Sequence, residues 1–239
     1  MKFALTAGLT LVIASTAAGA EPLDGDGVIV IDISEGMGAD AMVTSVNPTT
    51  NHGDSPVLAI KSIDYSIKKT YLRFDLTRVP EDAQIEAAQL VFTTNNNHAK
   101  EQTIEVFGLM DGHDGEKWAE GLGGETNSLE EGINYENAPA NALKVGGGEN
   151  AQSEFSGGVL ASDVLHLGSF EVLRKMGIAG DTFIFSTTEL IDFLNADSKG
   201  GVTMILTAID RQNSQDVGFS SKEDTNRPAP ELRLKWKNP

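Results

Sequence analysis

The chain contains no cysteine among its 239 residues. This absence excludes disulfide bonds, thiolate metal sites and a cysteine nucleophile. A domain without disulfides needs a sizeable hydrophobic core, and about 200 residues are enough to build one. One large all-β domain fits this length better than two small domains.

Basic residues are scarce. The chain has 18 Lys and Arg residues against 35 Asp and Glu residues, a net charge of −17. Nucleic acids and anionic membranes are therefore poor partners, because each requires a basic face. Two interpretations of the acidic residues stay open. They form the solvated coat of a secreted protein, or some of them hold Ca²⁺.

No long hydrophobic run follows the first 20 residues, and those residues are typical of a secretory signal. Lys2 gives the positive start, 9–13 form the apolar run, and 18–20 form a small-residue cleavage site. The run is too short to span a bilayer. We predict a signal peptide over 1–20, a mobile acidic leader over 21–27 and a single domain over 28–239. The mature protein is then secreted, either extracellular or periplasmic, with no membrane span.

The clearest pattern in the chain is a strand over 69–76. Leu72 and Phe74 alternate with Tyr71 and Arg73, which predicts one buried face and one free face. A proline-bearing turn follows, and then a second strand over 85–92. Further strands are expected at 28–31, 57–61, 103–109, 202–209 and 232–236.

Two other segments stand out. The capping box over 186–189 predicts the start of a short helix. The glycine-rich, acidic segment over 111–158 has little periodicity, so it is either functional or an insertion.

Several motifs, in order, resemble the DNRLRE-type module, which is related to archaeal disaggregatase repeats and to carbohydrate-binding module family 96. The strand over 71–76 and the "Ile-x-x-Ala-x-Leu" pattern over 85–90 carry the first match. The other matches lie at 40–43 with 51–53, at Trp118 with 133–139, and at 219–228. The resemblance implies an all-β, antiparallel jelly-roll β-sandwich with one short helix. It also implies binding of an acidic polysaccharide such as alginate.

The outward residues of the strands are the candidate ligand-binding residues. Tyr71 and Arg73 share a face, and Lys61, Lys222 and Arg227 are expected near them. Residues two apart on a strand are about 6.8 Å apart and adjacent strands about 4.8 Å apart, so a basic grid could meet successive carboxylates. The planar fork of arginine suits this role. The alternative for Arg73 is a salt bridge to a carboxylate on the same sheet.

Calcium is a candidate structural cofactor. Four aspartates lie at expected strand ends, where side chains and carbonyls could hold Ca²⁺. They are Asp40, Asp64, Asp181 and Asp210.

No enzyme motif is evident. The four histidines lack zinc-site spacing, and no Gly-x-Ser-x-Gly elbow occurs. Paired carboxylates stay open because their separation depends on the fold. Segment 84–86 reads Gln-Ile-Glu where family-7 alginate lyases carry Gln-Ile-His. We therefore predict a secreted, non-catalytic carbohydrate-binding module with no catalytic residues. The alternatives are a structural or adhesive cell-surface matrix protein, with other surface proteins as partners, and a polysaccharide lyase.

Overall fold

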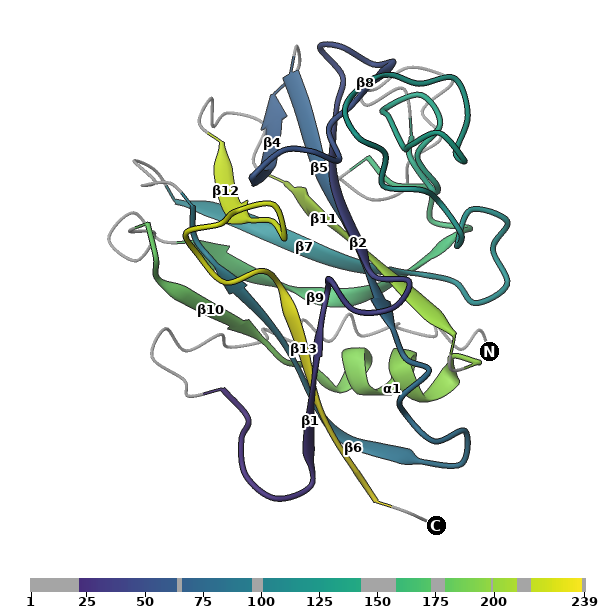
Figure 1. Cartoon of the computed structure of the whole chain (residues 1–239), viewed down its shortest axis with the longest axis vertical. Coiled ribbons are helices and arrows are strands. Elements are labelled where there is room, and N and C mark those ends of the chain that lie inside the picture. Colours follow the sequence, from purple (N-terminus) through teal and green to yellow (C-terminus); the bar gives the residue numbers. More distant parts are fainter. Residues whose placement is uncertain are drawn as a thin grey trace, which may run out of the picture.

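Two antiparallel β-sheets packed face to face make up the computed structural model, with one helix on their flank (Figure 1). The structure describes residues 22–63, 66–95, 101–142, 158–172, 179–198, 200–209 and 216–237. The predicted class, an all-β antiparallel sandwich with one short helix, is confirmed. The predicted signal peptide lies outside the described residues.

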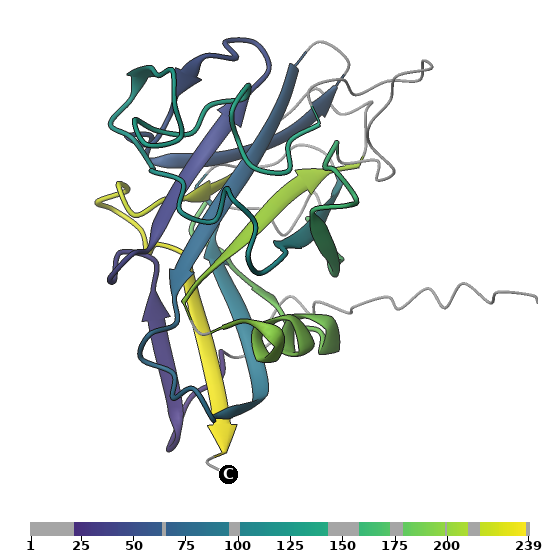
Figure 2. The ribbon, with the colours of Figure 1, turned by 90° about the vertical axis from the view of Figure 1, so that its right-hand side faces the viewer.

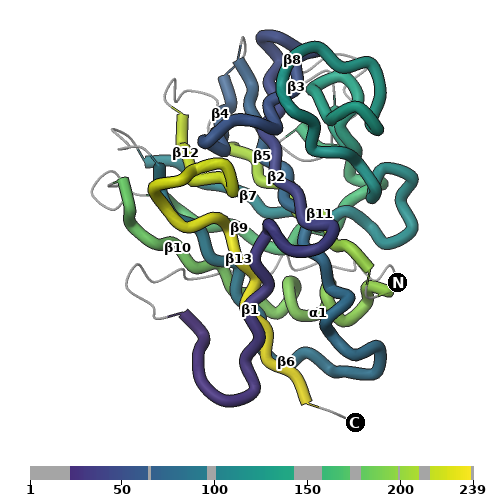
Figure 3. The backbone as a smooth tube through the Cα atoms, viewed as in Figure 1, coloured from purple at the N-terminus to yellow at the C-terminus, as the bar shows by residue number. Residues whose placement is uncertain are grey.

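Sheet A has four strands in the order β1-β13-β6-β10. Its members are β1 (Val28–Asp32), β6 (Gln84–Thr93), β10 (Thr182–Phe185) and β13 (Glu231–Lys237). The first and last strands of the chain are neighbours, with Ile31 opposite Leu232. Figure 3 shows them running side by side. This sheet therefore joins the two ends of the described chain.

Sheet B has the order β12-β4-β5-β11-β7-β9, and β2 pairs with β5 as well. Its members are β2 (Ala39–Thr44), β4 (Val57–Ile63), β5 (Ser66–Asp75), β7 (Gln102–Leu109), β9 (Val164–Val172), β11 (Gly201–Ala208) and β12 (Val217–Ser220). Strand β5, the strand predicted with most detail, pairs with β2, β4 and β11. It is the central organising strand of the sheet.

The main core lies between the two sheets. Leu72 and Phe74 of β5 are fully buried there, and so are Leu232 and Leu234 of β13. These residues occupy alternate positions, as a strand with one face on a core requires. The inward faces predicted from the sequence are therefore confirmed.

The outer face of sheet B is also buried, and here the prediction of a free face is wrong. Tyr71 is 0% exposed and belongs to a second hydrophobic cluster with Phe107 and Ile205. Trp118 and Ile133 complete that cluster from the other side. They come from residues 110–142, which we call the covering loop; in Figure 1 it is the teal segment beside β2. The low-periodicity segment is thus a third layer.

The covering loop is tied to the sandwich by a small sheet of β3 (Thr50–Asn51) and β8 (Gly124–Glu125). Asn51 is buried, and its side-chain nitrogen donates to the carbonyl oxygens of Glu120, at 2.5 Å, and Ile133, at 2.7 Å. Its side-chain oxygen accepts from the backbone N–H of Gly123 at 2.8 Å. One asparagine therefore satisfies several backbone groups of a loop that has few ladder bonds of its own.

Helix α1 (Thr188–Ala196) contacts β6 and β9, on the flank shown in Figure 2. The oxygen of Thr187 caps it by accepting from the N–H of Leu190 at 3.0 Å. The short helix is as predicted, but its cap lies one residue after Ser186, where the capping box over 186–189 puts it. Leu190, Phe193 and Leu194 enter the main core. Within the described ranges, no helix is long and apolar enough to cross a membrane.

The acidic leader is in contact with sheet A from Leu23 onward. The backbone N–H of Leu23 donates to Gln89 at 2.5 Å, and its carbonyl accepts from Arg233 at 2.9 Å. The mobility expected of the leader over 21–27 stays a prediction, but at Leu23 the leader lies against sheet A. Its backbone groups are paired by polar side chains of β6 and β13.

Candidate functional site

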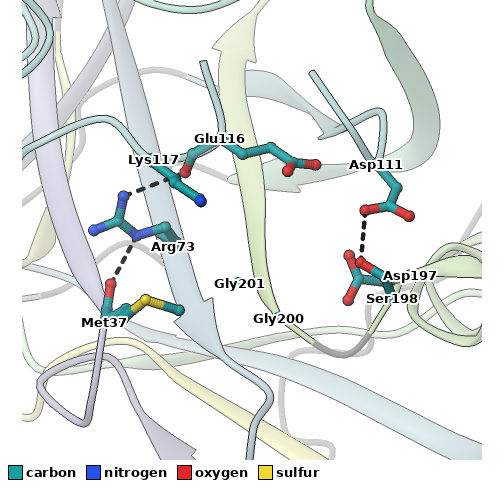
Figure 4. A pocket seen from close by; sticks show the side chains of 9 residues that line it. All are labelled: Met37, Arg73, Asp111, Glu116, Lys117, Asp197, Ser198, Gly200 and Gly201. Atoms are coloured by element: carbon teal, nitrogen blue, oxygen red, sulfur yellow. Dashed lines mark hydrogen bonds between the residues drawn. The ribbon is translucent and has the colours of Figure 1, made fainter. Parts of the chain in front are cut away.

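A pocket of about 330 Å³ opens beside Arg73, where β5, the covering loop and the end of α1 meet (Figure 4). Its lining carries both signs of charge. Arg73 and Lys117 supply the positive groups, while Asp111, Glu116 and Asp197 supply three carboxylates. Such a lining can bind sugar hydroxyls, but the excess of carboxylates disfavours a polyanion.

The guanidinium of Arg73 donates hydrogen bonds to backbone carbonyls, two of them in the covering loop. Its Nε donates to the carbonyl of Met37 at 2.7 Å, and its Nη1 donates to the carbonyls of Glu116, at 3.3 Å, and Trp118. It also lies over the Trp118 ring, 5.0 Å from the centroid. Burial lowers the pKa of Arg73, and the charges of Glu120 and Asp75 act against this. The alternative of a salt bridge is not found among the described residues, where the guanidinium bonds to carbonyls.

The side chain of Tyr71 is fully buried, so a ligand cannot contact it in this structure. Its hydroxyl donates to the carbonyl of Pro139, and burial raises its pKa above the ordinary range. Its pairing with Arg73 on one sheet face is as predicted, but the covering loop lies over that face. A tyrosine so placed has no access to solvent for proton transfer.

Lys61 and Lys68 form a pair of neighbouring positive charges. They are cross-strand partners on β4 and β5. Both bridge to Asp216, Lys61 at 3.2 Å and Lys68 at 2.5 Å. Lys61 was predicted as a ligand residue and Lys68 was missed. The register of β4 against β5, which pairs them, is not readable from the sequence.

Three carboxylates from distant parts of the chain meet at a second place, which we call the carboxylate cluster: Asp40 of β2, Glu120 of the covering loop and Glu223 after β12. One oxygen of each lies within 4.8 Å of the others. Lys222 lies beside them. Its Nζ is 2.6 Å from Glu120, and its backbone N–H donates to Asp40 at 2.9 Å.

The electrostatics of the cluster reflect its burial. Burial raises the pKa of Asp40 to about 8, with further repulsion from Glu223 and Glu120. Burial likewise raises the pKa of Glu120 to about 7, although Lys222 acts in the opposite direction. For Lys222, burial lowers the pKa, but the contact with Glu120 outweighs this and the net pKa is raised. Asp40 and Glu120 therefore bind a proton more readily than exposed carboxylates do.

The predicted residues are thus only partly brought together. Arg73 and Lys222 are both close enough to Glu120 for its charge to act on them. Lys61 belongs to the separate Asp216 pair, and Arg227 bridges to Asp224 at 3.4 Å. No single basic grid joins these predicted cations within the described residues.

Of the predicted calcium ligands, Asp40 alone lies in the cluster. Asp181 lies next to β10, where its backbone pairs with Thr94. Asp64 and Asp210 fall outside the described residues. Glu120 and Glu223 were missed, although they stand beside Trp118 and Lys222 of the recognised motifs. Their position next to matched motifs was the one sequence signal that could have identified them.

The family comparison covers β2 to β8 together with the covering loop. A search of curated proteins found no match. The family model for carbohydrate-binding module family 96 matches residues 35–146, so this part of the chain is similar to that family, and the similarity supports a carbohydrate-binding module.

Proposed function

We propose that this protein is a secreted, non-catalytic module whose carbohydrate ligand is an acidic polysaccharide such as alginate. The family similarity supports carbohydrate binding. The observation that supports an acidic ligand is the pairing of Lys61 and Lys68, which bridge to Asp216 and to no other carboxylate among the described residues. Two ammonium groups that share one carboxylate leave positive charge for a ligand carboxylate.

The location of this pair matters because the molecule as a whole is strongly acidic. A net charge of −17 repels a polyanion at long range. Screening confines this repulsion to about 8 Å at physiological ionic strength, so a local lysine pair can act at contact. The proposal therefore places the polysaccharide at the β4–β5 lysines and not in the Arg73 pocket with its three carboxylates.

Calorimetric titration of the mature protein with alginate, polygalacturonate and a neutral glucan tests this proposal. We expect binding to the two uronates and weaker binding to the glucan. The Lys61→Gln/Lys68→Gln variant should lose about tenfold in affinity, the range expected for one charge-assisted hydrogen bond. The matched control is Lys235→Gln/Lys237→Gln on β13, which removes the same charge from exposed positions of sheet A.

Two outcomes would contradict the proposal. Equal affinity for the neutral glucan, or equal losses in both double variants, would remove the acidic-ligand assignment. An increase in unsaturated-product absorbance with the same polysaccharides would show turnover and support a lyase.

A further inference from the structure

The carboxylate cluster joins three segments that are far apart in the chain. Asp40 lies on β2, Glu120 follows Trp118 in the covering loop, and Glu223 follows β12. All three belong to or adjoin motifs that the sequence analysis singled out. Neither the core nor the proposed polysaccharide contact uses them.

Two buried carboxylate oxygens in this cluster receive no N–H or O–H donor from the described residues. Asp40 is 1% exposed, and its Oδ2 accepts from the backbone of Lys222. Its Oδ1 is one of the two oxygens, and the Asp40 and Glu223 side chains can bond to each other only if they share a proton or a cation. The Oε2 of Glu223 is buried and equally unsatisfied. Unpaired buried carboxylate oxygens are costly, so they point to a positively charged group between them.

The ammonium of Lys222 does not neutralise these oxygens. Its Nζ contacts Glu120 at 2.6 Å but lies 3.9 Å from Glu223. When all three carboxylates are ionised, they and the one ammonium leave two negative charges. This deficit equals the charge of one divalent cation.

We propose that Asp40, Glu120 and Glu223 bind one calcium ion. Ca²⁺ takes oxygen ligands at about 2.3–2.6 Å, so oxygens on opposite sides of it are about 4.8 Å apart. The three oxygens lie within 4.8 Å of one another, which fits that shell. Mg²⁺ needs a tighter octahedron, and the set has no nitrogen or sulfur ligand that would favour zinc or copper.

The placement gives the ion a structural task. It would join the edge strand β2, the covering loop and the connection between β12 and β13. The covering loop has little regular secondary structure, so a cross-link to two other segments would stabilise it against opening. This role does not depend on the identity of the polysaccharide.

The test uses the whole mature protein after treatment with a chelator and removal of the chelator. Calorimetric titration with CaCl₂ should show one saturable site, and the thermal midpoint should rise with Ca²⁺ and less with Mg²⁺. Tb³⁺ in place of Ca²⁺ should give luminescence on tryptophan excitation, because Trp118 is two residues from Glu120, and Ca²⁺ should quench it by competition.

Three variants locate the site. Glu223→Gln should lower calcium affinity at least tenfold, while Glu86→Gln, an exposed glutamate paired with Lys237, should leave it unchanged. Lys222→Gln removes the competing ammonium and keeps all three carboxylates, so it should tighten calcium binding several-fold. The Lys222→Gln variant therefore tests the site through a gain in calcium affinity, even if Glu223→Gln fails to fold.

The proposal is overturned if the chelator-treated protein shows no saturable calcium site. It is also overturned if calcium affinity is the same in the Lys222→Gln variant as in the unaltered protein. Either result would mean that the cluster holds shared protons and not a cation.

Discussion

The hydroxyl of Tyr71 donates a hydrogen bond to the carbonyl oxygen of Pro139, 3.0 Å away. This bond ties the centre of sheet B to the covering loop. Tyr71→Phe should lower the free energy of unfolding by about 1–2 kcal/mol, because the buried carbonyl loses its partner. Tyr71→Ala should cost about 3–5 kcal/mol by opening a cavity. Chemical denaturation measures both changes. If Tyr71→Ala left the free energy of unfolding unchanged, Tyr71 would be solvent-exposed, as the alternation in the sequence predicts.

Thr187 caps α1 and also anchors it. Its hydroxyl accepts from the N–H of Leu190 and donates to the carbonyl of Leu167 at 2.8 Å. Thr187→Ala should destabilise the protein by about 1–2 kcal/mol, whereas Thr187→Ser should restore most of this. The adjacent Thr188 is exposed, so Thr188→Ala is the matched control for thermal unfolding. Equal effects at the two threonines would contradict the cap assignment.

Gly108 on β7 gives room to Phe193 of α1. A Cβ at this glycine would lie 2.6 Å from Cε2 of the Phe193 ring. Gly108→Ala should therefore cost about 1–3 kcal/mol through overpacking. In the Gly108→Ala/Phe193→Leu double variant the cost should be less than the sum of the single costs, because the clash is removed. Strict additivity in denaturation experiments would show that the two residues do not interact.

Lys69 gives the stability a distinctive pH dependence. Its ammonium donates to the Asn141 side chain and the Gly158 carbonyl, and no described carboxylate forms a salt bridge with it. Burial lowers the pKa of Lys69 from 10.5 to about 7. Between these values the unfolded chain binds a proton that the folded chain has lost. Stability should therefore rise with pH in this window, by up to about 1.4 kcal/mol per pH unit.

Comparison with Lys69→Met isolates this effect. Below the lowered pKa, lysine is charged in both states and its burial cost is constant, so the difference between the two proteins should change only as pH rises through the window. Lys237→Met, at an exposed position, should follow the unaltered protein throughout. Parallel profiles for Lys69→Met and the unaltered protein from pH 7 to pH 10 would contradict the lowered pKa.

The strands and the helix were largely readable from the sequence because their signals are local. Alternation placed Leu72 and Phe74 inward, and the capping box placed the start of α1. The second buried face was not readable. The side chains of Tyr71 and Arg73 can face solvent, or they can be buried if their polar groups find partners. Here Pro139 and Trp118 of the covering loop are those partners, and that segment has no periodicity to predict them from.

The same limit applies to the candidate sites. Asp40 was predicted as a ligand because it stands at an expected strand end, but its partners Glu120 and Glu223 are about 80 and 180 residues away, and no spacing rule joins such distant ligands. Lys61 was recognised as an outward cation, whereas Lys68 depends on the register across β4 and β5. The charged residues of each candidate site are close together in the fold but far apart in the sequence or on different strands.

The pairing of β1 with β13 has a consequence for the order in which the molecule forms. A chain that emerges from its N-terminus onward carries Val28–Asp32 unpaired until Glu231–Lys237 has been made, because β13 separates β1 from β6 in sheet A. Contacts between such distant segments carry a large loop-closure cost and form slowly. A chain cut before Glu231 should therefore leave β1 unpaired in sheet A, although β6 and β10 can still pair with each other.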